Sequence, residues 1–182
     1  KVVKLNTPNF DLWPSGGSSP ECGVEKVDLT TSTSECESED SLPAGGSGAQ
    51  VSAQTAVYVG GVEAGGDIGM PSNKLFVVEA GNVTELPMPQ PRVGSAVVRL
   101  SDSKALVWAG NFDVELNTAA LIVDVVNKTV TAPPVSGEQV PVTMWASAVY
   151  AGQGADGEHQ VLVAGGTDMT LSDETVSAPI PP

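Results

Sequence analysis

Short apolar runs that stop abruptly on glycine recur along this sequence and limit the folds it can adopt. Three of them, AVYVGG, ALVWAG and VLVAGG, end at Gly60-Gly61, Ala109-Gly110 and Gly165-Gly166. The first residues of these pairs are 49 and 56 residues apart. A second landmark, a valine that leads toward prolines, recurs at spacings of 47 and 46, at Val83, Val130 and Val176. Two landmarks that repeat near 50 residues indicate a repeat architecture, because such periods are typical of propellers and solenoids.

The repeating unit is predicted to consist of strands. The 20 Gly and 14 Pro separate runs rich in Val, Ala and Thr, and β-branched residues favour pleated strands. Residues 96–110 predict a hairpin with a polar turn at Ser101–Ser103, and residues 148–166 predict another with a longer tip. We therefore expect an all-β chain. Its first 50 residues read as an irregular Gly-, Ser- and acid-rich segment that includes a degraded unit.

One segment of the first repeat, FVVEAGNVTELPMPQPR, resembles the unit of kelch β-propellers. In that family a strand ending in a diglycine is followed by two aromatics seven residues apart and then by a proline-rich link. Phe76 takes the first aromatic position and Val83 the second, and the link is matched by Pro87, Met88, Pro89 and Arg92. The second repeat keeps this spacing with Val123 and Val130 but lacks both aromatics.

The resemblance implies a kelch-like β-propeller segment of about three blades, at residues 51–92, 93–142 and 143–182, whereas a complete propeller has about four to eight. Each glycine pair would end a strand where neighbouring backbone leaves no room for a Cβ and the chain turns sharply. A β-sandwich with accidental spacing is the alternative fold.

Charge and cysteine content indicate where such a chain works. The net charge of −14 argues against nucleic acid and anionic membrane surfaces as partners. No apolar run approaches the roughly 20 residues that span a bilayer. A disulfide between Cys22 and Cys36 would stabilise the fold by about 3 kcal/mol and would indicate an oxidising compartment. Sequons at Asn82 and Asn127 fit the same extracellular, cell-surface or periplasmic location.

Catalytic and metal-binding residues are sparse. His159 is the single histidine, so a Ser-His-Asp set or a histidine-rich metal site is not expected. Acidic residues follow the glycine landmarks at Asp67, Asp113 and Asp168, and they could line one face, although Asp is also a common turn residue. The acidic segments 34–40 and 154–158 could attract calcium, but neither matches a calcium-binding loop. No other cofactor is expected.

These features together predict a non-enzymatic binding or assembly module. Rigid strands would display the connecting loops 61–73, 111–117 and 151–159 to a protein or glycan partner. One alternative is a structural subunit of a filament, surface layer or adhesin that neighbouring chains complete. Another is a fragment of a carbohydrate-active propeller enzyme.

Overall fold

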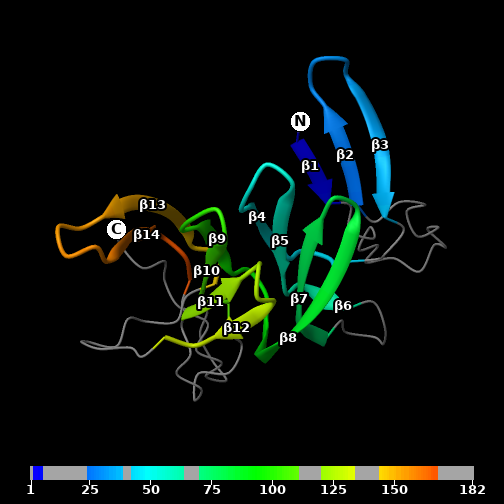
Figure 1. Ribbon diagram of the computed structural model, residues 1–182. Coiled ribbons are helices and arrows are strands. Elements are labelled where there is room, and N and C mark those ends of the chain that lie inside the picture. The colour runs from blue at the N-terminus through cyan, green and yellow to red at the C-terminus, as the bar shows by residue number, and fades with distance from the viewer. Residues whose placement is uncertain are drawn as a thin grey trace.

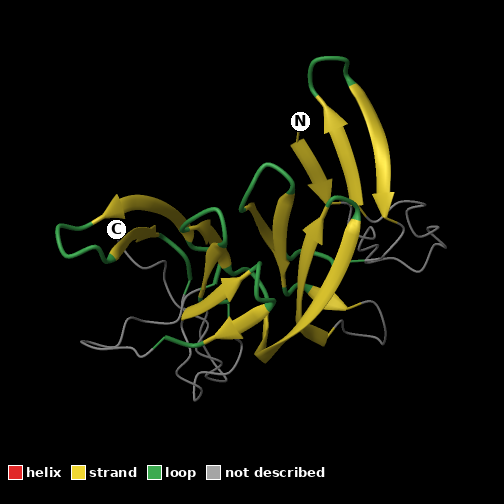
Figure 2. Cartoon of the chain, in the orientation of Figure 1, coloured by secondary structure: helices red, strands yellow, loops and turns green. Residues whose placement is uncertain are grey.

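A computed structural model of the chain describes residues 2–5, 24–38, 42–63, 70–110, 120–133 and 144–167 (Figure 1). These residues form antiparallel strands and turns, and they contain no helix (Figure 2). The prediction of an all-β chain is confirmed for this part of the protein. The described strands divide among four separate sheets, which we call sheets I to IV in chain order, rather than between the two sheets of a sandwich.

Sheet I lies at the N-terminus and has the strand order β1-β2-β3. Its strands are β1 (Val2–Leu5), β2 (Val24–Asp28) and β3 (Thr33–Ser38). The sequence predicted mostly irregular structure here, with one short strand in 23–31. The difference arises because backbone hydrogen bonds hold these paired strands, and such bonds require no apolar periodicity.

Sheet II is an antiparallel meander in which β4, β5, β7 and β8 pair in succession. Its long strands follow the apolar runs, and β8 contains the whole proline-rich link. The bounds are β4 (Ser47–Gln50), β5 (Thr55–Val59), β7 (Met70–Glu79) and β8 (Asn82–Arg92). A short additional strand, β6 (Val62–Glu63), pairs with the beginning of β7.

Sheet III repeats this meander, and sheet IV repeats its first half. Sheet III contains β9 (Ala96–Arg99), β10 (Lys104–Trp108), β11 (Ala120–Asp124) and β12 (Thr129–Thr131). Sheet IV contains β13 (Ser147–Gln153) and β14 (His159–Ala164). Both hairpins that the sequence predicted are confirmed. The first strands of the three sheets adjoin, because β4 lies beside β9 and β9 lies beside β13.

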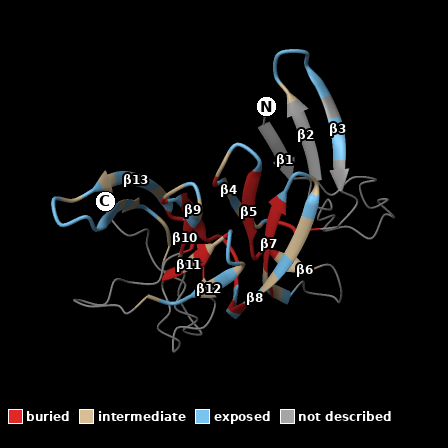
Figure 3. Ribbon diagram, viewed as in Figure 1, coloured by how far each residue is buried: buried red, intermediate tan, exposed pale blue. Residues whose placement is uncertain are grey.

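The core lies between successive sheets rather than within one layer. The largest cluster joins sheets II and III and contains Val57, Val77, Val107 and Leu121, each fully buried. A smaller cluster joins sheets III and IV, with Leu106 on one side and Val161 on the other. Figure 3 shows the buried residues concentrated in sheets II and III, whereas sheet IV is largely exposed. All five residues of β5 are buried, which explains why this strand reads as a continuous apolar run.

The glycine pairs end the second strand of sheets II, III and IV, and the backbone is left-handed at each. The φ angles are 59° and 103° at Gly60-Gly61, 57° and 81° at Ala109-Gly110, and 70° and 96° at Gly165-Gly166. A Cβ at Gly60 would lie 2.1 Å from the carbonyl oxygen of Arg92. Positive φ and close backbone therefore both require glycine at this position.

A second left-handed position recurs in the chain, two residues before the first strand of each of these sheets. It is occupied by Gly45, Gly94 and Trp145, with φ angles of 69°, 67° and 56°. Sequence reasoning missed this landmark because a tryptophan, which rarely adopts positive φ, replaces glycine in the third repeat. The Trp145 amide donates to the Gly94 carbonyl at 2.7 Å, so equivalent positions of sheets III and IV contact each other.

Arg92 connects sheets II and III at this end. Its side chain is fully buried and donates through Nη1 to the Ala109 carbonyl, while its own carbonyl accepts from the Gly61 amide at 2.8 Å. Burial lowers the pKa of Arg92 to about 10, so the guanidinium remains charged at neutral pH. The arginine of the predicted link is thus a structural contact between sheets.

Candidate binding surface

Sheets II and III each have two distinct ends, one that carries tight turns and one that carries a glycine pair. In sheets II and III the tight turns gather at one end, where the Ala80 amide donates to Gln54 and the Val125 amide donates to Ser103. The glycine pairs lie at the other end, because the strands run antiparallel and Ser47 at the beginning of β4 pairs with Val59 at the end of β5. We call these the turn end and the glycine end.

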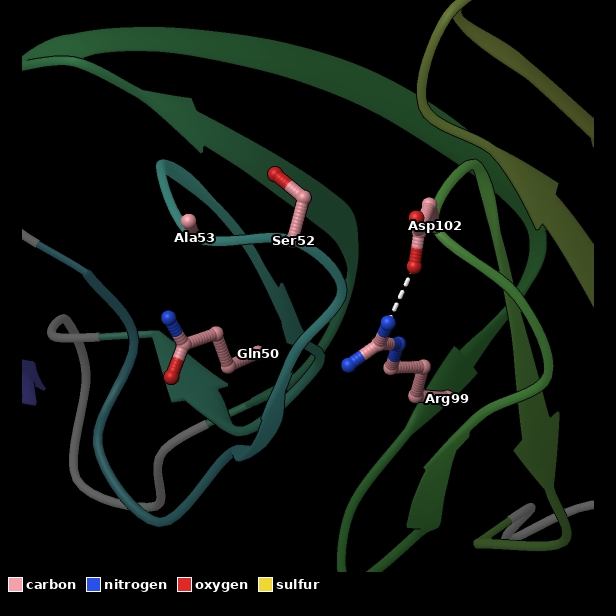
Figure 4. Close-up of a pocket in the computed structure, with 5 residues that line it drawn as sticks. All are labelled: Gln50, Ser52, Ala53, Arg99 and Asp102. Carbon is pink, nitrogen blue, oxygen red and sulfur yellow. Dashed lines mark hydrogen bonds and ion pairs between the residues drawn. The ribbon is translucent and has the colours of Figure 1, made fainter.

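A groove of about 460 Å³ opens at the turn end between sheets II and III. Gln50, Ser52 and Ala53 come from the end of β4 and its turn, and Arg99 and Asp102 come from the end of β9 and its turn. Figure 4 shows the first three residues on one side of the groove and the ion pair of Arg99 with Asp102 on the other. The site therefore exists only because two sheets adjoin.

Buried anchors hold both walls of the groove. Val51 is fully buried and its amide donates to the Thr55 carbonyl at 2.8 Å, which closes the β4–β5 turn. Leu100 is buried as well, and its amide donates to the Lys104 carbonyl at 2.9 Å in the β9–β10 turn. Val51 and Leu100 thus fix the two turns, and the adjacent polar side chains of Gln50 and Arg99 are exposed.

The lining side chains offer an amide, a hydroxyl, a guanidinium and a carboxylate. The Arg99–Asp102 pair is exposed, and such pairs contribute only about 0–1 kcal/mol to stability. Its main effect is to orient the guanidinium, whose remaining N–H groups can donate to a ligand. This arrangement suits a polar partner that carries hydroxyl, carbonyl or carboxylate groups.

Two of the predicted display loops, 61–73 and 151–159, are partly strand, because β6 and the beginning of β7 lie in the first and β13 extends to Gln153 in the second. Segments 61–73 and 111–117 follow glycine pairs, and only residues 61–63 and 70–73 of them are described. Segment 151–159 contains the β13–β14 turn, which lies at the opposite end of its hairpin from Gly165.

The predicted metal candidates are not placed by the structure. Asp67, Asp113 and Asp168 lie outside the described residues. Within the described ranges, no three His, Cys, Asp or Glu side chains gather as a metal site would require. In the acidic segment 154–158, Asp156 Oδ1 accepts from the Glu158 amide at 3.1 Å, within a hairpin turn that the Gly154 amide closes by donating to the Glu158 carbonyl at 2.9 Å.

His159, Trp108 and Trp145 each contact neighbouring residues of the fold. His159 begins β14, is exposed, and its Nδ1 lies 3.0 Å from the Tyr150 hydroxyl. Trp108 is partly buried and packs against the cluster between sheets III and IV. Trp145 is 59% exposed and its ring lies over Gly94.

The sequons lie at or directly after hairpin turns of sheets II and III. Asn82 follows the β7–β8 turn and Asn127 lies in the β11–β12 turn, and both are exposed. The Asn127 side-chain amide donates to Asp124 Oδ2 at 3.0 Å. Cys36 is an exposed residue of β3, and Cys22 lies outside the described residues, so the disulfide stays a prediction, as does glycosylation.

No protein-family model matches the chain, and no curated protein matches it in sequence. Among the described residues there is also no helix long and apolar enough to cross a membrane.

Proposed function

We propose that this chain is a segment of a kelch-like β-propeller that acts as a non-catalytic extracellular binding module. The observation that carries the proposal is the repeated junction between sheets II, III and IV. Each has a left-handed residue pair after its second strand and a left-handed residue before its first strand. Adjoining first strands and four-stranded meanders in sheets II and III are what a propeller requires.

The turn-end groove supplies the binding surface in this proposal. Turns from two rigid sheets form its walls, so its polar groups are held in place before a partner arrives, which lowers the entropic cost of binding. The partner is a protein segment or a glycan with hydroxyl or carbonyl groups that Gln50, Ser52 and Arg99 can bind. The extracellular location rests on the predicted Cys22–Cys36 disulfide and on the two sequons.

A screen of glycans and secreted proteins, followed by nuclear magnetic resonance of the complex, tests this function. We expect a bound partner to shift the signals of Gln50, Ser52 and Arg99. The double variant Gln50→Ala with Arg99→Ala should weaken binding about tenfold or more, since each lost hydrogen bond contributes about 0.5–1.5 kcal/mol. Lys104→Ala is the matched control, because this exposed cation lies outside the groove lining. Equal binding by the double variant and the control would refute the groove as the site.

A further inference from the structure

The outer edge of β14 is unusual among the strand edges of this protein. In sheets II and III the second strand lies between two neighbours, whereas β14 pairs only with β13 within the described residues. Other edge strands carry features that discourage pairing with another chain. β4 and β9 have four residues each, and β8 contains three prolines. The sequence of β14, HQVLVA, has six residues with no proline and no Asp, Glu, Lys or Arg.

The apolar row that crosses each sheet is incomplete in sheet IV. In sheet II the row runs Ala49–Val57–Val77, and in sheet III it runs Val98–Leu106–Ile122. The equivalent row in sheet IV is Val149–Leu162, and it stops there in the described part of the chain. Val98 and Leu106 are 6% and 9% exposed, whereas Val149 and Leu162 are 57% and 62% exposed.

We propose that two copies of this chain associate through β14. A two-fold axis perpendicular to the sheet would pair β14 with its copy in antiparallel fashion, with Leu162 opposite Leu162. The result is a four-stranded sheet, the size of the meanders in sheets II and III, and the Leu162 side chains continue the apolar row in the position of Val77 and Ile122. Such an interface is closed, because both copies use the same surface.

The hairpin's own side chains do not oppose a second copy at this edge, although the chain as a whole is acidic. The net charge of −14 opposes association in general, but β13 and β14 contain no Asp, Glu, Lys or Arg. The hairpin is also the part of the described structure that projects from sheets II and III, on the opposite side from sheet I (Figure 1). Among the described strands, only β13 pairs with β14, so no described strand occupies this edge.

The oligomeric mass and the hydrogen exchange of the 182-residue chain test this inference. We expect a dimer of 18.5 kDa chains in which the β14 amides that point away from β13 exchange slowly and become unprotected on dilution. Leu162→Lys places two like charges opposite each other and should weaken the dimer about tenfold or more. Val126→Lys is the matched control, because Val126 is 71% exposed in the β11–β12 turn and should leave the dimer unchanged.

A cysteine variant tests the register without relying on loss of association. Opposed residues in an antiparallel pair have Cα atoms about 4.5–5.5 Å apart, which a disulfide can bridge. Leu162→Cys should therefore form a 162–162 crosslink on mild oxidation, identified by peptide mass, whereas Val126→Cys should not. Arg99→Ala removes a groove residue but should dimerise normally. Loss of ligand binding at the groove and loss of dimerisation through β14 are therefore measured independently.

Three results would overturn the inference. A monomer in which the outward-pointing β14 amides exchange slowly would mean that residues 168–182 of the same chain cover the edge. A monomer in which these outward-pointing amides exchange rapidly would mean that the edge stays open. A dimer that both Leu162 variants leave unchanged and uncrosslinked would associate through another surface.

Discussion

The glycine pairs allow the cost of a left-handed backbone to be separated from the cost of a steric clash. Gly60 and Gly165 occupy the same position in sheets II and IV, with φ of 59° and 70°. A Cβ at Gly60 would lie 2.1 Å from the Arg92 carbonyl oxygen, whereas at Gly165 no described atom lies within 4 Å. Alanine at Gly165 therefore tests conformation alone, and alanine at Gly60 tests conformation and packing together.

We expect Gly165→Ala to destabilise by about 1 kcal/mol, the usual cost of a left-handed L-residue. Gly60→Ala should cost about 3 kcal/mol or more, because the displaced Arg92 carbonyl also loses the hydrogen bond from Gly61. With a urea slope near 2 kcal/mol/M, the unfolding midpoints should fall by about 0.5 M and 1.5 M. Tryptophan fluorescence measures both midpoints, and hydrogen exchange reports local opening of the β13–β14 hairpin. Equal losses in the two variants would refute the close approach at Gly60.

Three further perturbations test the junctions and turns. Arg92→Met should destabilise by about 2–4 kcal/mol in urea unfolding, because a buried donor to the Ala109 carbonyl is removed. Tyr58→Phe should cost about 1–2 kcal/mol by the same assay, since the buried Tyr58 hydroxyl accepts from Gly46 at 2.9 Å and donates to Pro43. Hydrogen bonds from the Asn127 amides lower the pKa of Asp124, so the stability it contributes should be lost as the pH falls below about 4.

The sign for Asp124 follows from proton uptake. The folded carboxyl has the lower pKa, so the unfolded chain binds the proton first and acid favours unfolding. Asp124→Ala should remove this part of the acid sensitivity, and an unchanged acid profile would contradict the turn contact. Burial raises the pKa of Tyr58, and an ordinary tyrosine titration by ultraviolet absorbance would contradict its burial. Arg99→Met, at an exposed arginine, is the control for Arg92→Met and should change stability by less than about 0.5 kcal/mol.

Part of the fold was predictable because it depends on short stretches of the sequence. The hairpins at 96–110 and 148–166 follow from short apolar runs around polar turns, and they were located correctly. The glycine pairs were identified as sharp turns, which their φ angles bear out. The predicted crowding is confirmed at Gly60 and Gly110, but at Gly165 no described atom lies within 4 Å of a Cβ. The groove was not predicted, because Gln50 and Arg99 are ordinary polar residues whose proximity depends on how two sheets pack.

From residue 51 onward, the sequence by itself predicted the strands, the hairpin turns and the recurring glycine pairs, since strands and turns depend on neighbours a few residues apart. It did not predict the three strands of sheet I. The left-handed backbone of Trp145, at the position equivalent to Gly45 and Gly94, depends on tertiary structure, because the Trp145 amide donates to the Gly94 carbonyl. The tertiary structure also decided that Leu106 is buried while Leu162 is exposed. Both leucines stand three residues before a landmark pair and look alike in sequence. Their environments differ because another sheet covers the first, whereas no described sheet covers the second.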